Sequence, residues 1–233
     1  MVNSVLNLSV CNFCGGSEFV PGPKGRLSKT KKPPLCKECG SLERHRVLRQ
    51  VNLKLREVCP FDSYSCLHIS KDVSVEPEWF KDYELSVYGK INSIDLQKID
   101  RPDCSYDVVV CNHVLEHVEN DVQALKELFR VFNKDGLFQL SVPEPIRAKE
   151  TVDWGYADKS QFGHYRIYGI DIEDKFKQAM TEDICYLKVY ASDPVTEDKD
   201  MCFLFFKSRG FAHIVSNVLG NNFIIESVNI RSA

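Results

Sequence analysis

Four cysteines near the N-terminus have the spacing that most clearly indicates chemistry. They form two CxxC pairs separated by 21 residues: Cys11, Cys14, Cys36 and Cys39. A glycine directly follows each pair (Gly15 and Gly40), and glycine lets the backbone turn its N–H groups toward sulfur. Four thiolates satisfy the tetrahedral preference of Zn²⁺ and leave no coordination position for a substrate. The pattern predicts a structural zinc site, with a redox-active CxxC pair, unligated core cysteines and an iron–sulfur centre as alternatives.

The segment around these cysteines has too few apolar residues to fold on burial alone. We expect a zinc-ribbon-like module at 1–42 in which metal binding supplies the folding energy. The module is basic from Lys24 to Lys37, although the whole chain carries a formal net charge of -3. That balance gives no global attraction to nucleic acid or anionic membranes, so nucleic acid is not the expected partner.

The remaining cysteines are scattered, mostly in apolar segments, as is common in a reducing compartment: Cys59, Cys66, Cys104, Cys111, Cys185 and Cys202. The N-terminus lacks the basic region and cleavage site of a signal peptide. No apolar run reaches the roughly 20 residues of a membrane-spanning helix. We therefore expect a cytoplasmic protein without a membrane span.

Downstream of the module the hydrophobic pattern changes twice. Apolar residues at helical spacing predict a linker helix within 43–60, with Ser41 as its N-cap. From 61 to 209, short apolar strands alternate with helices, which predicts a Rossmann-like α/β domain. The predicted strands are Ser65–Ile69, Glu84–Tyr88, Asn92–Leu96, Val108–Cys111, Leu137–Val142, Cys185–Ala191 and Cys202–Lys207, with a helix from about Asp121 to Phe132.

Two long motifs resemble a known family. The run INSIDLQKIDRPDCSYDVVVCNHVLEHVENDVQALKELFRVFNKDGLFQLSVP is similar to class I S-adenosylmethionine (SAM) methyltransferases of the ubiquinone-biosynthesis-like group. The preceding CNFCGG and LCKECGSLERHRVL resemble a subgroup with an N-terminal cysteine-rich module. The resemblance implies a seven-stranded methyltransferase sheet whose last strand is antiparallel, with SAM bound across the first four strand ends.

Carried over onto this sequence, the resemblance implies a set of cofactor-binding residues at the strand ends. Asp95 and Leu96 correspond to the adenine site, and the loop after the fourth strand lines the methionine end. Two features depart from the family: GxGxG is absent, and Tyr88 stands near the place of the ribose-binding acid, for which Asp72 or Glu84 could substitute. The cofactor candidates are His68, Ser70, Asp72, Tyr88, Asp95, Leu96, Cys111, Asn112 and His113.

The segment from His113 to His117 reads HxxEH, the pattern of inverted zinc proteases. Because it directly follows an apolar strand, a protease site is not favoured. Glu116 and His117 could hold a divalent ion, or could simply shape a helical turn. Alternatively, His113 or His117 acts as a general base that takes a proton from an alcohol acceptor, and His164 is a further base candidate.

An aromatic and polar insertion from Pro143 to Ile172 follows the fifth strand. Loops beyond strand ends commonly build acceptor pockets, and aromatic rings with arginine suit sugars and other polar rings. The acceptor candidates are His45, Trp154, Tyr156, His164, Arg166 and Tyr168, with Arg44 and Arg46 as further contributions from the linker helix. Packing roles for Trp154, Tyr165 and Tyr168 are the alternative.

We therefore expect a SAM-dependent enzyme that methylates an oxygen of a small-molecule or carbohydrate-like acceptor. The alternatives are a nucleic-acid-binding or -modifying protein that uses the basic module, and a catalytically inactive scaffold. The apolar tail at 210–233 either docks on the core or pairs with a second copy in a homo-oligomer.

Overall fold

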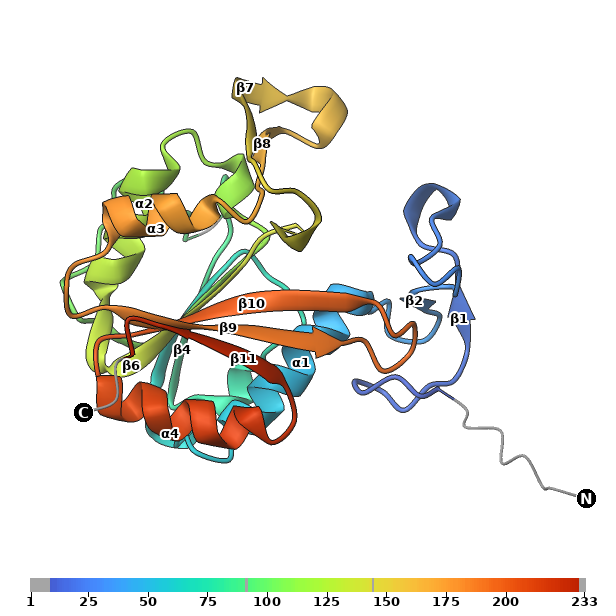
Figure 1. Cartoon of the computed structure of the whole chain (residues 1–233), viewed down its shortest axis with the longest axis horizontal. Helices are drawn as coiled ribbons and strands as arrows, with labels where there is room; N and C mark the ends of the chain where they lie inside the picture. Colours follow the sequence, from blue (N-terminus) through green and yellow to red (C-terminus); the bar gives the residue numbers. More distant parts are fainter. Residues whose placement is uncertain (1–8, 91, 144, 231–233) are drawn as a thin grey trace, which may run out of the picture.

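The computed structural model describes residues 9–90, 92–143 and 145–230. Its centre is a seven-stranded sheet in the order β11-β9-β10-β6-β5-β3-β4 (Figure 1). The strands are β3 (Ser65–Ile69), β4 (Asp82–Ser86), β5 (Tyr106–Asn112), β6 (Phe132–Ser141), β9 (Cys185–Ser192), β10 (Lys199–Phe206) and β11 (Ile224–Val228). Strands β4, β3, β5 and β6 are parallel, whereas β10 and β11 pair antiparallel with their neighbours. The predicted α/β fold with a seven-stranded sheet is confirmed.

One predicted strand is wrong. Residues 92–96 form a turn and loop because Asn92 adopts a φ of 60° and its side-chain amide donates to the Leu85 carbonyl at 2.9 Å. The Ser86 hydroxyl accepts from the Ile94 N–H at 3.0 Å. Side-chain hydrogen bonds thus take the place of strand pairing for these backbone groups. The seventh strand is instead β11, at the opposite edge of the sheet.

Helices cover both faces of the sheet (Figure 1). On one face lie α2 (Asp121–Val131) and α3 (Ile172–Ala179), and on the other α1 (Glu43–Leu55) and α4 (Arg209–Gly220). The predicted helix at Asp121 is confirmed, and the Asn120 side chain begins it by accepting from the Gln123 N–H at 3.1 Å. Its apolar stripe, including Leu125 and Leu128, is fully buried against the sheet.

The first crossover has no α-helix among its residues, all of which the structure describes. Only a 3₁₀ helix, η3 (Pro77–Trp79), lies between β3 and β4. On this face, Val51 and Leu55 of α1 pack in the same buried cluster as Val108 and Val110 of β5. The linker helix therefore covers the sheet where a crossover helix would otherwise lie.

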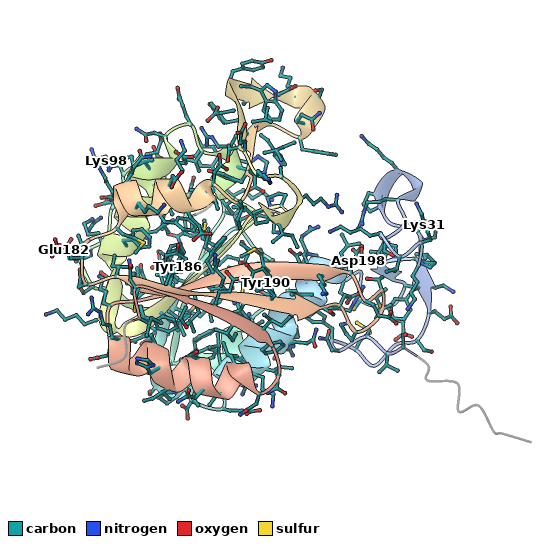
Figure 2. The ribbon with its side chains drawn as sticks, in the orientation of Figure 1. Lys31, Lys98, Glu182, Tyr186, Tyr190 and Asp198 are labelled. Carbon is teal, nitrogen blue, oxygen red and sulfur yellow. The ribbon has the colours of Figure 1, made fainter. Side chains whose placement is uncertain are left out.

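The N-terminal module docks on the β9–β10 hairpin. It contains β1 (Phe19–Val20), β2 (Leu35–Cys36) and η1 (Pro23–Gly25). The backbone N–H of Lys29 donates to Asp198 at 2.8 Å, and the Thr30 hydroxyl donates to the Thr196 carbonyl at 2.5 Å. Figure 2 shows the two sides of this contact, marked by Lys31 and Asp198. Because β9 is parallel to β6, this hairpin lies at the carboxyl edge of the sheet.

The insertion after β6 forms an arm that extends beyond the sheet (Figure 1). The arm is a hairpin of β7 (Val152–Asp158) and β8 (His164–Ile167). The remaining 3₁₀ helices are η2 (Phe61–Ser63), η4 (Leu115–His117), η5 (Pro145–Arg147) and η6 (Lys159–Gln161). The apolar tail docks on the core through α4 and β11. None of the helices in the described ranges has the length and hydrophobicity required to span a bilayer.

Candidate functional site

The four cysteines of the module converge on one point. Their sulfur atoms all lie within 4.8 Å of one another, with 3.6 Å between Cys11 and Cys39 and between Cys14 and Cys36. Zinc–sulfur bonds of about 2.3 Å in a tetrahedron separate the sulfurs by about 3.8 Å, so these residues fit a zinc ion. The predicted four-cysteine cluster is confirmed.

The expected N-cap of the linker helix has a different role. Leu42 precedes α1, and its N–H donates to Nδ1 of His45 at 3.2 Å. The Ser41 hydroxyl instead lies 3.2 Å from the sulfurs of Cys11 and Cys39. The prediction of Ser41 as N-cap is therefore wrong, because its side chain faces the cysteine cluster.

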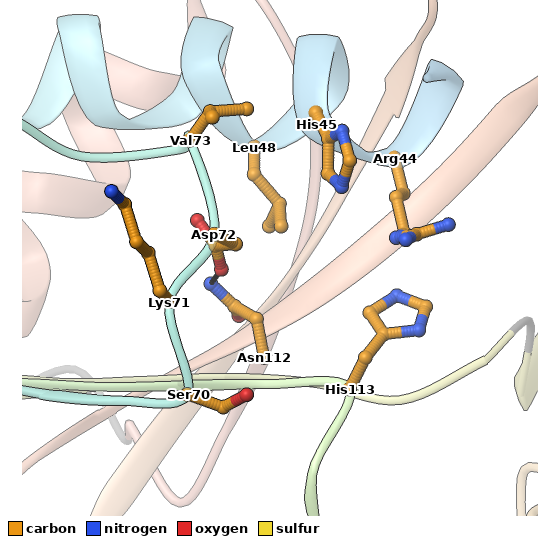
Figure 3. Close-up of a pocket in the computed structure, with 9 residues that line it drawn as sticks. All are labelled: Arg44, His45, Leu48, Ser70, Lys71, Asp72, Val73, Asn112 and His113. Carbon is orange, nitrogen blue, oxygen red and sulfur yellow. Dashed lines mark hydrogen bonds between the residues drawn. The ribbon is translucent and has the colours of Figure 1, made fainter. Parts of the chain in front are cut away.

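A cavity of about 410 Å³ opens at the carboxyl ends of β3 and β5 (Figure 3). The first turns of α1, the loop after β3 and the loop after β5 enclose it. Its lining residues are Arg44, His45, Leu48, Ser70, Lys71, Asp72, Val73, Asn112 and His113. In doubly wound sheets, ligands bind at this edge, beyond the strand ends.

Two lining residues have strained backbones. Ser70 and His113 adopt φ values of 61° and 54°, in the left-handed region that costs a non-glycine residue about 1–3 kcal/mol. The Ser70 N–H donates to the Ser86 carbonyl at 2.8 Å, and the His113 N–H donates to the Ser141 carbonyl at 2.9 Å. Pairing with adjacent strands thus holds both residues in conformations that turn the chain at the cavity.

Asp72 is the acidic group of the cavity. Its carboxylate accepts from the Ser74 N–H at 2.6 Å and from the Asn112 side-chain amide at 3.0 Å, and Nε2 of His68 lies 3.6 Å away. Burial would raise the pKa of Asp72, but the neighbouring His68 ring and the hydrogen bond from Ser74 hold it well below its usual range. The cavity therefore contains a fixed negative charge at neutral pH.

Arg44 is the cationic group opposite it. Figure 3 shows Arg44 and His113 pointing into the same space from α1 and from the end of β5. Among the described residues, no carboxylate forms an ion pair with Arg44, and burial lowers its pKa. Burial, with a contribution from Arg44, lowers the pKa of His113 to about 3 and that of His45 to about 4. Both imidazoles are thus neutral near pH 7.

A second cluster adjoins the cavity. Glu116 and His117 on η4 and His164 at the start of β8 each place a ligand-type atom within 4.8 Å of the others. The rings of His117 and His164 meet edge to face, with centroids 4.6 Å apart. Oε1 of Glu116 lies 3.9 Å from Nδ1 of His113, and burial raises the pKa of Glu116 to about 8. The HxxEH segment therefore forms a 3₁₀ turn whose last two residues meet the arm.

Four of the predicted cofactor residues line the cavity, and the others lie elsewhere. The four are Ser70, Asp72, Asn112 and His113. His68 is buried beneath Asp72, while Leu96 and Cys111 are in the core. Tyr88 is 82% exposed on the turn after β4, and the Asp95 carboxylate is exposed and accepts from the Gln97 N–H. Lys71 and Leu48 also line the cavity, although neither was among the predicted cofactor residues. Lys71 could have been predicted from the sequence, because it lies between the candidates Ser70 and Asp72.

The predicted acceptor residues divide into interior and surface groups. Arg166 is buried and donates to Asp153 at 2.7 Å and to the Glu119 carbonyl at 2.7 Å. The Tyr168 hydroxyl is buried and donates to Asp121 at 3.0 Å. Trp154 is partly exposed and Tyr156 is 59% exposed, both on β7. Arg166 and Tyr168 thus fasten the arm to the segment between η4 and the start of α2.

Arg46, expected as a contribution from the linker helix, lies outside the cavity. Its guanidinium forms two hydrogen bonds to Asp193 of the hairpin, at 2.6 and 2.9 Å, and both side chains are fully buried. This pair joins α1 to the β9–β10 hairpin. It therefore fixes the helix that carries Arg44 and His45 over the cavity.

Several solved structures resemble this chain. A SAM-dependent methyltransferase from Thermotoga maritima has 14% identity and a TM-score of 0.44, covering 70% of this chain and 91% of that chain. A SAM-dependent methyltransferase from Aquifex aeolicus has 11% identity and a TM-score of 0.40, covering 69% of this chain and 89% of that chain. The trans-methyltransferase CalH in complex with SAH has 14% identity and a TM-score of 0.44, covering 69% of this chain and 55% of that chain.

The sequence itself identifies the family. A search of curated protein sequences finds no match. Residues 39–182 match the family described as a methyltransferase domain. Because this match extends over more than half of the 233 residues, the chain belongs to the methyltransferase domain family and is a methyltransferase enzyme.

Proposed function

We propose that this enzyme transfers a methyl group from SAM to an oxygen of a small-molecule or carbohydrate-like acceptor. The observation that supports it most is the pairing of Arg44 and Asp72 on opposite sides of one cavity. The methionine end of SAM carries a carboxylate and an ammonium group. The Arg44 guanidinium, which has no ion-pair partner among the described residues, suits the carboxylate, and the ionised Asp72 suits the ammonium. The cavity volume lies within the usual range for ligand sites.

The adenosine end belongs beyond the cavity, toward β4. Tyr88, Asp95 and Leu96 remain our candidates for it, by resemblance to the family. Glu84 is not free to take the place of the ribose-binding acid, because Arg101 donates to it at 2.5 Å and the Tyr106 hydroxyl donates to it at 2.5 Å. Asp72 is the ammonium partner in this proposal, so we assign no acid to the ribose.

Asp72→Asn is expected to weaken SAM binding by roughly 10- to 100-fold. The amide keeps the shape of the side chain but removes the charge, and a hydrogen bond to a charged group contributes about 1.5–3 kcal/mol. Calorimetric titration with SAM measures the change. Asp62→Asn, the same substitution at an exposed carboxylate, is the matched control. Equal affinity in the two variants would contradict the role of Asp72.

His113 is the proposed proton acceptor because it is the histidine that lines both the cavity and the approach to the arm. When bound, SAM supplies a methyl carbon that the acceptor oxygen takes as the carbon–sulfur bond breaks and its electron pair stays on sulfur. The neutral imidazole of His113 then receives the proton that the acceptor hydroxyl loses. His117 and His164, which lie together at the base of the arm, border the acceptor side.

His113→Asn is expected to lower kcat by at least about 100-fold, with little effect on SAM affinity, since general-base catalysis contributes about that much. Asparagine tolerates the left-handed backbone of this position. The rate is measured as SAH release with a panel of sugars, nucleotide sugars and phenols as acceptors. His213→Ala, at an exposed histidine of α4, is the control. Full activity in His113→Asn would rule out this role.

A nucleic-acid function for the basic module is less well supported. Lys32 forms an ion pair with Glu197 at 2.8 Å, and the backbone of Lys29 and Thr30 binds Asp198. Part of the basic segment from Lys24 to Lys37 thus contacts the β9–β10 hairpin. Salt-sensitive RNA binding would favour the alternative.

We propose that the four cysteines hold a structural zinc ion, that the chain belongs with the ubiquinone-biosynthesis-like group, and that it acts in the cytoplasm. The surface that we propose for a homo-oligomer is the edge strand β11, since α4 packs on the chain's own sheet.

A further inference from the structure

We propose that His68 is a positioning residue for the methyl donor, acting through Asp72. Tyr83 fixes the His68 ring as the tautomer that carries its hydrogen on Nε2. That N–H holds the Asp72 carboxylate in the orientation that receives the SAM ammonium, so this role rests on the proposed function. His68 is fully buried, outside the lining of the cavity, and does not itself touch SAM.

The three side chains form a row that leads from the sheet to the cavity. Tyr83 lies on β4, His68 on the neighbouring parallel strand β3, and Asp72 in the loop that follows β3. The Tyr83 hydroxyl lies 2.7 Å from Nδ1 of His68, and the two rings meet edge to face with centroids 6.0 Å apart. On the opposite side of the imidazole, Nε2 lies 3.6 Å from Oδ2 of Asp72.

The Nε2 atom of His68 needs a partner. It is buried and has no hydrogen-bond partner among the residues that the structure describes. The acidic oxygen that faces it, Oδ2 of Asp72, lies just beyond hydrogen-bond distance. Hydrogen bonds in ligand-free sites are often long and tighten once the ligand binds. The Nε2–H of His68 is thus placed to close on Asp72 when the ammonium of SAM arrives.

The hydrogen bond at Nδ1 decides which tautomer His68 adopts. Burial raises the pKa of the Tyr83 hydroxyl, which therefore keeps its proton. Nδ1 of His68 is the acceptor that the described residues offer this hydroxyl, so Nδ1 accepts and Nε2 carries the ring hydrogen. The opposite tautomer would direct the Nε2 lone pair at the Asp72 carboxylate, and two acceptors facing each other repel.

Asp72 depends on such support because its loop lacks the GxGxG sequence that shapes the ligand site in many doubly wound sheets. The Ser74 N–H binds Oδ1 at 2.6 Å, and the Asn112 amide binds Oδ2 at 3.0 Å. A third donor from the strand below fixes the rotation of the carboxylate. Misplacement of a binding group by about 1 Å can cost a large factor in activity, so a residue that SAM does not touch can still set its affinity.

Calorimetric titration of zinc-loaded variants with SAM tests the role of His68. His68→Leu removes the N–H donor and is expected to bind SAM about tenfold more weakly. His68→Gln can place an amide N–H near the position of Nε2 and should recover most of that affinity. In an Asp72→Asn background, His68→Leu should change the affinity by less than about twofold, because the carboxylate that it positions is gone. Thermal unfolding checks that every variant is folded.

Nitrogen-15 NMR of the imidazole measures the tautomer directly, without SAM. Wild type is expected to show the Nε2–H tautomer of His68, and Tyr83→Phe a mixture of the two tautomers with SAM affinity about threefold lower. Tyr186→Phe is the matched control, because it also removes a hydroxyl hydrogen bond, to Glu173 at 2.6 Å, but from β9, which three strands separate from β3. It should change neither the tautomer nor the affinity.

Three results would overturn the role of His68. They are an Nδ1–H or doubly protonated ring in wild type, equal SAM affinity of His68→Leu and wild type, and an equal loss from His68→Leu with and without the Asp72 carboxylate. SAM binding that is unaffected by His68→Leu defeats the positioning role and leaves the proposed function standing. Absence of SAM binding in wild type defeats the proposed function and the role of His68 toward SAM, whereas the tautomer still reports whether Tyr83 orients the ring.

Discussion

Cys36→Ser is expected to abolish tight zinc binding, unfold residues 9–42 and remove most of the SAM affinity. Structural zinc contributes roughly 10–16 kcal/mol to the folding of small metal-binding modules. The two strands of this module have only two residues each, so the rest of the module offers little to replace that energy. Zinc analysis, hydrogen exchange and calorimetry with SAM measure the three effects.

The expected loss of SAM affinity follows from how the cluster is joined to the cavity. Ser41 faces the cysteine sulfurs, and its carbonyl accepts from Arg46 at 2.9 Å. Arg46 also donates to the Pro34 carbonyl at 2.9 Å, which ties the module to α1. The first turn of α1 presents Arg44 and His45 to the cavity. Loss of the module therefore loosens the side of the cavity that carries the cation.

Cys104→Ser is the matched control, because Cys104 is an exposed cysteine outside the cluster. It should keep full zinc content and SAM affinity. If Cys36→Ser also kept both, the cysteines would have no structural role in the site.

Arg46→Met is expected to lower the free energy of unfolding by about 3–5 kcal/mol. Arg46 and Asp193 are both fully buried, and removing one partner of such a pair leaves an uncompensated buried charge. From the described residues, the Asp193 carboxylate would keep only the hydrogen bonds from the N–H and hydroxyl of Thr196, each 2.8 Å. Urea unfolding measures the loss.

Lys54→Met provides the comparison for that measurement. Lys54 pairs with Glu57 at 2.7 Å on the surface, where an ion pair contributes about 0–1 kcal/mol. If Arg46→Met cost no more than Lys54→Met, the pair would not secure α1 to the hairpin.

The sequence predicted the parts of the site that depend on local pattern. The CxxC spacing located the four-cysteine cluster, and the apolar strands located the strand ends that carry Asp72, Asn112 and His113. Residues at the carboxyl ends of adjacent parallel strands meet wherever the strands pair, so the cavity follows from the strand assignments.

The features that the sequence did not predict depend on contacts between segments distant in the chain. Asn92 and Ser86 replaced a predicted strand with side-chain hydrogen bonds, which no periodicity reveals. Arg166 binds the Glu119 carbonyl and Tyr168 binds Asp121, each 47 residues earlier in the chain, so a sequence pattern cannot show that the two side chains are buried. The meeting of Glu116 with His164 has the same origin, since the arm must first fold back onto η4.

The most direct test of the account is a calorimetric titration of zinc-loaded wild-type protein with SAM. We predict saturable binding of one SAM per chain, with a dissociation constant between about 1 μM and 1 mM, the usual range for enzyme substrates. Absence of binding at millimolar SAM would contradict the central claim, because the cavity between Arg44 and Asp72 would then not be a methyl-donor site.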